Sequence, residues 1–343
     1  MPIRLKDIAL DLGVSVVTVS KALRNHQDIS SDTRDRILAR MKELKYQPNW
    51  AARSLVTGKS YLMGLVVPDL VHPFFAQVAK GASGVLRKQG YSLIISSSEE
   101  DAELEKKEIE QMIGQNLDVL IVASSQRGGK SFRHLDEQSK RYVLLDRRFK
   151  GLAANFVGTD EAIIGKMATE HLIENGCRWI AHICAKYASP AVERAKGYRQ
   201  TLASHGMPAP DSFLIRRTHG DDSGDLMGYQ AMKALLQLKP RPDGVFCYND
   251  TTAMGAMSAI LESGLRIPED IAIIGCGNVH YAPVLRVPLS SIDQNSEMMG
   301  AHAAKLALSL IDGKNGTPSP KSILLQPKLV ARASSLRDST AIS

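Results

Sequence analysis

The sequence predicts an α/β protein in two parts: an all-α segment over residues 1–60, then a larger domain of two lobes that each hold a parallel sheet. Three observations predict it. At 343 residues the chain is too long for one compact core. Its first sixty residues carry apolar positions at helical spacing. Beyond them, short apolar β-rich runs alternate with helical segments, and the runs are numerous enough for two sheets.

Composition points to an ordinary globular protein, with 44% hydrophobic and 23% charged residues. Charges stand where a signal peptide would have its apolar core, and no apolar run reaches the roughly 18–20 residues of a membrane span. Four scattered cysteines lack zinc-site spacing: Cys177, Cys184, Cys247 and Cys276. We therefore expect a cytoplasmic protein with no membrane association and no metal site.

The net charge of +7 is concentrated near the N-terminus. Residues 1–60 hold eleven lysines and arginines against six acids, whereas the rest of the chain holds 32 and 30. This local excess favours a polyanionic partner. A solvated basic surface without a partner is the alternative.

A first helix is predicted by one apolar face. Its members recur at helical spacing: Leu5, Ile8, Ala9 and Leu12. Gly13 then offers the left-handed conformation that ends a helix.

A second helix follows, with Ser15 as its N-cap. Its predicted inward positions are Val19, Ala22 and Leu23. Another side of the helix carries three residues that could meet bases: Val16, Val17 and Lys21. Lysine donates to guanine, and valine methyls suit the thymine methyl group. Hydroxyls can hold phosphates, at Thr18 and Ser20.

A third helix is predicted to begin near Ser31 and to bury four apolar residues: Ile37, Leu38, Met41 and Leu44. Two short helices joined by a glycine-containing turn, with a supporting third, are typical of the helix-turn-helix. A three-helix bundle without a DNA role is the alternative. A further short helix with Asn49 as N-cap ends at Gly58 and needs a surface to order it, either duplex DNA or a second subunit.

Three stretches resemble the LacI/GalR (lactose repressor) family in order and spacing: LKDIALDLGVSVVTVSKAL, YQPNWAARSLVTG and MGLVVPDLVHPFF. The resemblance covers essentially the whole chain. It implies a helix-turn-helix domain over residues 1–47 and a hinge helix with linker over 48–60. Residues 61–343 would form a periplasmic-binding-protein-like domain for effector binding and dimerisation.

The resemblance also implies roles for residues that contact DNA. Val16, Val17 and Lys21 would read bases, and Leu55 would wedge into the minor groove and kink the duplex. Asn49 and Arg53 are expected to position the backbone. A homodimer would read a pseudo-palindromic operator, since one head reads half of it. For Leu55, packing on the body is the alternative.

Two Rossmann-like lobes are predicted after Tyr61, with a ligand cleft between them at the carboxyl ends of the strands. The strand-like runs are 62–67, 91–96, 118–123, 142–146, 179–184, 243–248 and 271–275, and helices such as 101–116, 160–175 and 295–311 lie between. The effector candidates follow strands or open helices: Asp69, His72, Phe74, Ser125, Asp146, Arg147, Arg194, Asn249 and Gln294.

These residue types suit a polyhydroxylated ligand, because carboxylates, amides and arginines pair with hydroxyls and an aromatic face covers a sugar ring. The resemblance implies effector contacts at five of them: Phe74, Asp146, Arg194, Asn249 and Gln294. Helix capping or a lobe-stabilising hydrogen bond is the alternative for each.

The chain departs from the family at Gly277, where family members commonly carry an aspartate that clamps sugar hydroxyls. Asn278 and His280 are candidate substitutes. Four arginines could add positive charge near the ligand: Arg127, Arg147, Arg148 and Arg194. A sugar acid or sugar phosphate is therefore an alternative to a neutral sugar.

Motifs for catalysis and for cofactors are missing from the sequence: it holds no G-x-G-x-x-G, no G-x-S-x-G and no H-E-x-x-H. We expect a transcriptional regulator, acting as a repressor, without enzymatic activity or cofactor. A secreted sugar-binding protein and a sugar-metabolising enzyme with an added DNA-binding head are the other classes. The direction of the effector's action and the use of a protein co-repressor stay open.

Overall fold

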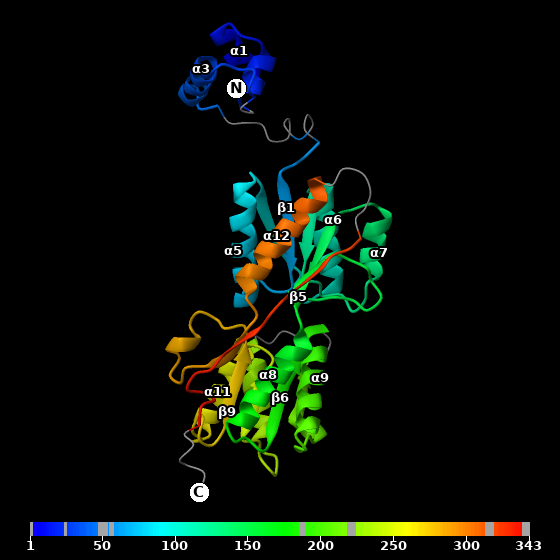
Figure 1. The fold of residues 1–343 in the computed structure, drawn as a ribbon, viewed down its shortest axis with the longest axis vertical. Helices are drawn as coiled ribbons and strands as arrows, with labels where there is room; N and C mark the ends of the chain where they lie inside the picture. Colours follow the sequence, from blue (N-terminus) through cyan, green and yellow to red (C-terminus); the bar gives the residue numbers. More distant parts are fainter. Residues whose placement is uncertain are drawn as a thin grey trace. The chain divides into compact units, whose positions relative to one another are not determined.

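The structure is a computed structural model that describes residues 3–23, 26–46, 54, 58–185, 189–217, 224–312 and 319–337. It divides into two compact units, Met1–Ser60 and Tyr61–Ser343. The first unit is all-α and the second holds two sheets, which confirms the predicted fold class (Figure 1).

Three helices form the N-terminal unit: α1 (Leu5–Leu12), α2 (Val16–Leu23) and α3 (Ser31–Glu43). Gly13 ends α1 with φ +65°. The Ser15 side chain accepts a hydrogen bond from the Thr18 amide at 3.0 Å, as an N-cap does. Ile8, Val19 and Ile37 are almost fully buried in one core.

The prediction of burial is wrong for two residues of this unit. Leu23 and Leu38 are 40% and 45% exposed. Each follows a buried residue, Ala22 or Ile37, by one position. One residue is about 100° around a helix, which carries these leucines off the buried face.

The second unit consists of two six-stranded sheets, one in each lobe. The first has the order β11-β5-β4-β3-β1-β2, with β1 (Leu62–Val67), β2 (Ser92–Ser97), β3 (Val119–Val122), β4 (Tyr142–Leu145), β5 (Phe156–Thr159) and β11 (Ser322–Leu325). The second has the order β12-β10-β9-β8-β6-β7, with β6 (Ile180–Ala185), β7 (Leu214–Arg217), β8 (Gly244–Cys247), β9 (Ala272–Cys276), β10 (Ser290–Asp293) and β12 (Lys328–Val330). All neighbours pair in parallel except β10 and β12.

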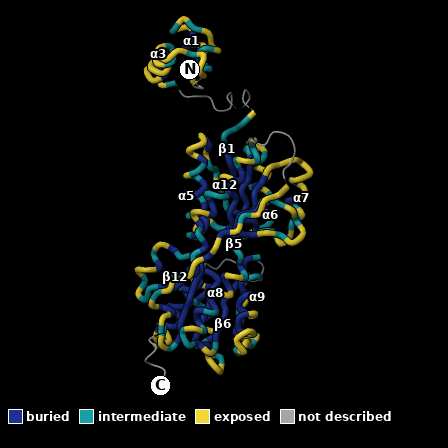
Figure 2. Tube along the Cα trace, in the orientation of Figure 1, coloured by how far each residue is buried: buried dark blue, intermediate teal, exposed yellow. Residues whose placement is uncertain are grey.

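Helices cover these sheets. Those of the first lobe are α5 (Pro73–Lys88), α6 (Ala102–Gly114), α7 (Lys130–Glu137) and α12 (Ser296–Asp312). Those of the second are α8 (Glu161–Glu174), α9 (Ser189–Ser204), α10 (Gly224–Leu235) and α11 (Asp250–Glu262), with short 3-10 turns at Asp211–Phe213 and Ala282–Val284. The buried core runs through the interior of each lobe (Figure 2). Among the described helices, none is long and apolar enough to cross a membrane.

The chain passes between the lobes three times: from β5 to α8, from β10 to α12 and from β11 to β12. The crossing segments are joined to one another. The Asn295 Nδ2 donates to the Gln326 carbonyl at 3.0 Å, and the Gln294 Nε2 donates to the Thr159 Oγ1 at 3.4 Å. The three segments are therefore connected to one another. We call them the hinge between the lobes, which is distinct from the predicted hinge helix over residues 48–60.

Candidate DNA-binding face and effector site

The predicted base-reading residues lie on one side of α2. Val16 and Val17 are 45% and 62% exposed, although both are apolar. Thr18 and Ser20 are both half-buried on the same short helix. Exposed valines beside hydroxyls form a surface that a thymine methyl and phosphate oxygens could meet.

Lys21 is not isolated on this face. Its Nζ lies 2.5 Å from the Asp28 carboxylate, which also accepts from the His26 ring at 2.8 Å. The hydrogen bond from Lys21 is the main cause that holds the pKa of Asp28 below its usual range. Sequence reasoning missed Asp28, because a residue in the loop after α2 shows no helical spacing to the reading positions. Lys21 therefore has to exchange an internal carboxylate for a base or phosphate when it contacts DNA.

The predicted hinge residues Asn49, Arg53 and Leu55 lie outside the described residues.

Three effector candidates of the first lobe lie where β1 leads into α5. The Asp69 carboxylate accepts from the Val71 amide at 2.7 Å and so shapes the turn. His72 is the N-cap of α5, with its Nδ1 3.3 Å from the Phe74 amide. Phe74 is buried against Phe75, with ring centroids 5.0 Å apart.

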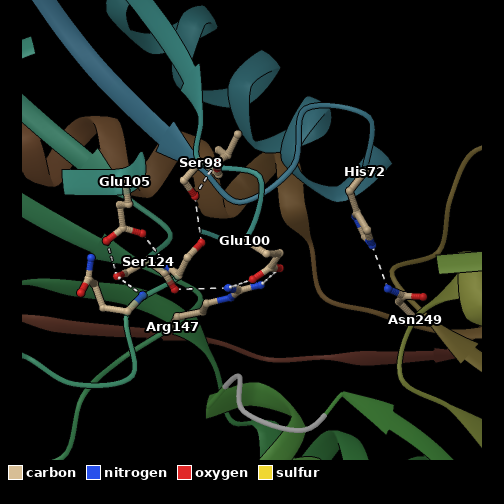
Figure 3. Close-up of polar contacts among 10 residues, drawn as sticks. His72, Ser98, Glu100, Glu105, Ser124, Arg147 and Asn249 are labelled. Atoms are coloured by element: carbon tan, nitrogen blue, oxygen red, sulfur yellow. Dashed lines mark hydrogen bonds and ion pairs between the residues drawn. The ribbon is translucent and has the colours of Figure 1, made fainter. Parts of the chain in front are cut away.

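His72 and Asn249 join the two lobes directly. The His72 Nε2 lies 2.9 Å from the Asn249 Nδ2, and Figure 3 shows the two side chains pointing toward one another. The Asn249 Oδ1 accepts from the Thr252 amide at 2.8 Å, so it also caps α11. The structure thus brings together two predicted residues that are 177 positions apart in the sequence.

Arg194 is 3% exposed and lies on α9. Its Nε donates to the Glu161 carboxylate at 2.6 Å, and its guanidinium stacks 4.7 Å from the centroid of the Tyr248 ring. Gln294 is buried in the hinge, where its Oε1 accepts from the Cys276 Sγ at 3.4 Å. Glu161 was not among the predicted site residues, since an acid at a helix start is explained by capping.

Asp146 follows β4 in a left-handed conformation with φ +59° and is 8% exposed. Burial, followed by the Glu161 charge, raises the pKa of Asp146 to about 7, against the opposing effect of Arg194. In the described part of the chain, no hydrogen bond reaches its carboxylate. A buried, uncommitted carboxyl is a group that a ligand hydroxyl would complete.

Ser125 belongs to a polar network at the ends of β2 and β3 (Figure 3). Its hydroxyl lies 2.8 Å from that of Ser98. Its amide donates to the Glu105 carboxylate, which also accepts from the Ser124 hydroxyl at 2.7 Å. Burial raises the pKa of Glu105. The network fixes the loop after β3, so Ser125 has a structural partner as well as a place near the lobe junction.

The four predicted arginines fall into two classes. Arg147 and Arg194 are buried, whereas Arg127 and Arg148 are exposed, with the Arg148 guanidinium 5.6 Å from the centroid of the Phe156 ring. Both Arg147 terminal nitrogens donate to Glu100, at 2.9 and 2.6 Å. The buried arginines are therefore already paired with carboxylates.

The departure at Gly277 has a local explanation. Its φ of +125° favours glycine, and a Cβ there would lie 3.6 Å from the Asp250 Oδ2. Asp250 is buried, accepts from the Ser291 hydroxyl at 2.6 Å and from the Val279 amide at 2.8 Å, and has its pKa raised to about 6 by burial. An aspartate at 277 would place a second carboxylate beside it in a strained backbone.

A surface groove of about 610 Å³ lies between α5 and the start of α12, and none of the predicted effector residues lines it. Among the described residues, no group of histidine, cysteine or acidic side chains could hold a metal ion.

Comparisons with known proteins agree with this two-part arrangement. Residues 4–49 match bacterial regulatory proteins of the lacI family, and residues 169–335 match a periplasmic binding protein-like domain. The regulator GalR of Salmonella typhimurium (strain LT2) is 34% identical over 331 residues, covering 96% of this chain and 95% of its own. The repressor PurR of Mannheimia succiniciproducens is 30% identical over 345 residues, covering 96% and 98%.

Two solved structures show the same likeness. The Lac repressor dimer bound to operator and the anti-inducer ONPF has a TM-score of 0.85 and 25% identity, covering 98% of this chain and 100% of its own. The complex of the regulator CelR with cellobiose has a TM-score of 0.73 and 29% identity, covering 97% and 99%. The chain therefore belongs to the lacI family of bacterial regulatory proteins, which are DNA-binding transcriptional regulators.

Proposed function

We propose that this chain represses transcription as a cytoplasmic homodimer on a pseudo-palindromic operator. The observation that supports the proposal is the exposed side of α2. Val16 and Val17 are exposed to solvent on a basic unit, and neither belongs to the hydrophobic core of that unit. Val16, Val17 and Lys21 read bases, and Thr18, Ser20, Asn49 and Arg53 hold the backbone. Leu55 wedges into the minor groove between the half-sites.

We also propose that a carbohydrate-type effector binds at the lobe junction. It is bound by residues that follow strands or open helices in both lobes: Asp69, His72, Phe74, Ser125, Asp146, Arg147, Arg194, Asn249 and Gln294. Binding shifts the relative position of the lobes through the hinge, and thereby the affinity for operator. The ligand is bound and released unchanged. Recovery of a converted sugar would contradict that last statement.

Selection of binding sites from random duplex DNA by the full-length protein tests the DNA assignment. We expect enriched sites with two-fold symmetry. Lys21→Ala should relax base preference at one position in each half-site, at a cost of about 1–3 kcal/mol for the preferred base. Leu55→Ala should weaken specific binding far more than non-specific binding. Sites without symmetry, or an unchanged preference in Lys21→Ala, would refute these roles.

Thermal unfolding of the full-length protein against a panel of sugars tests the effector assignment. A ligand at 100 times its dissociation constant stabilises the native state by about 2.7 kcal/mol. Asp146→Ala should abolish the shift from any active sugar, whereas Arg127→Ala, an exposed arginine, should retain it. An equal shift in both variants would place the sugar elsewhere.

A further inference from the structure

Five charged side chains gather at the lobe junction. Four of them are at most 8% exposed, and the fifth, Glu100, has a side chain that is 27% exposed. The set comprises Asp146, Arg147, Glu161, Arg194 and Glu100. The other four each shift the pKa of Asp146, which lies among them. The junction therefore holds three carboxyls and two guanidiniums.

Each guanidinium already has a carboxylate of its own. Glu100 approaches Arg147 with both oxygens, at 2.9 and 2.6 Å, in the fork geometry that a bound carboxylate would use. Glu161 accepts from the Arg194 Nε at 2.6 Å. A ligand carboxylate or phosphate would meet guanidiniums whose charge is already balanced by these acids, and it would also meet the buried Asp146.

The backbone at Glu100 shows that its position is built into the fold. Glu99 and Glu100 both have left-handed conformations, with φ +48° and +57°. Non-glycine residues in this region are strained and persist where the surroundings hold them. The Glu100 amide donates to the Pro68 carbonyl at 3.1 Å, and its side chain is anchored by Arg147, as Figure 3 shows.

We propose that Glu100 and Glu161 are specificity-determining residues that neutralise Arg147 and Arg194 and exclude anionic ligands, so that the effector is an uncharged, hydroxyl-rich molecule. The inference rests on the proposed effector function. It favours the uncharged one of the two ligand classes that the sequence left open, because the internal acids already balance the charge of both arginines.

The experiment compares matched neutral and anionic sugars on the full-length protein. The probes are glucose, galactose and cellobiose beside glucuronate, galacturonate and glucose 6-phosphate, with affinities from thermal shift and calorimetry. We expect a neutral probe to bind the wild-type protein at least tenfold more tightly than its anionic counterpart. Glu100→Gln should bind the anionic counterpart at least tenfold more tightly than the wild-type protein does, while affinity for the neutral sugar changes by less than about threefold.

Glu99→Gln is the matched control. It makes the same change of charge one residue away, on an exposed side chain with a similar backbone conformation, and should leave both affinities unchanged. Glu161→Gln tests the second pair and should also gain anion binding, so the inference is still tested if Glu100→Gln does not fold.

Two outcomes would overturn the inference in distinguishable ways. If the wild-type protein prefers the anionic probes, or if Glu99→Gln gains as much as Glu100→Gln, the acids do not set selectivity, although the effector role stands. If no probe shifts the wild-type protein or the variants, the carbohydrate effector itself is refuted and the selectivity falls with it. Neither result bears on the proposed binding of operator DNA, which is tested by a separate experiment.

Discussion

At the scale of single residues, the lobe junction contains one buried acid, Asp146, whose carboxylate accepts no hydrogen bond in the described part of the chain. Asp146 is 8% exposed, and its pKa is raised to about 7, chiefly by burial and then by Glu161. An unfolded aspartate has a pKa of about 3.9. Between these two values the folded protein binds more protons than the unfolded chain, so the free energy of unfolding falls as the pH rises through this window.

We therefore expect the protein without sugar to lose on the order of 2 kcal/mol of stability between pH 5 and pH 7.5 through Asp146. Asp146→Asn should flatten this part of the profile, because the amide does not titrate. Denaturant unfolding at both pH values measures the difference. Asp250, with a pKa raised to about 6, contributes in the same direction in both proteins, so the difference between their slopes isolates Asp146. Parallel profiles would contradict the shifted pKa.

Residue types and strand ends in the sequence predicted both partners of one important contact and only the basic partner of three others. His72 and Asn249 were both predicted, and their meeting across the lobes follows from the fold. Asp28, Glu100 and Glu161 were not predicted, because acids in loops and at helix starts have ordinary explanations in turns and capping. Their roles depend on which lysine or arginine side chain they contact, and the tertiary structure determines that contact.

At the scale of elements, each lobe contains pairs of helices that pack closely because glycines lie at their contacts. The pairs are α5 with α12, α8 with α9, and α10 with α11, with glycines at Gly81 and Gly300, Gly165 and Gly197, and Gly228 and Gly255. A Cβ at any of these would lie 1.7–2.1 Å from a backbone oxygen of the partner helix. The α5–α12 pair lies on the first lobe, where α12 arrives from the hinge (Figure 1).

Gly81→Ala should force α5 and α12 apart, since its Cβ would lie 1.9 Å from the Glu297 carbonyl oxygen. Overpacking of this kind costs about 1–3 kcal/mol. Gly84→Ala is the control on the same helix: nothing lies within 4 Å of its Cβ, and alanine there should stabilise by up to about 1 kcal/mol. Chemical denaturation of both variants measures the contrast. Equal stabilities would mean that the helices are not held at this distance by Gly81.

The sequence predicted the alternation of strands and helices because apolar runs and amphipathic periods are local properties. It did not predict the glycine contacts, since a glycine inside a helical pattern shows no sign of which partner it meets. The exposure of Leu38 was also not predicted, because it too depends on tertiary packing. Periodicity places a helix face within about one residue, and packing against α1 and α2 decides which apolar residue is buried.

At the scale of the whole molecule, the larger unit displays isolated apolar side chains on both lobes. Val71, after β1, is 89% exposed and Val284, after β9, is 81% exposed. A two-fold dimer would bring the same surface of each copy into contact, and exposed apolar side chains would be buried if they lie on that surface. The two valines therefore provide a direct test of the proposed homodimer.

Val71→Asp and Val284→Asp should each weaken dimerisation, because a carboxylate would have to be buried without a partner at the interface. We expect sedimentation velocity to show a shift toward monomer at micromolar concentration. Operator affinity should fall with it, since a single head reads only one half-site. Val192→Asp is the matched control on α9, 53% exposed, and should remain dimeric. If all three variants stay dimeric and hold operator as the wild-type protein does, the subunits associate through other surfaces, and the two valines are ordinary solvent-exposed residues.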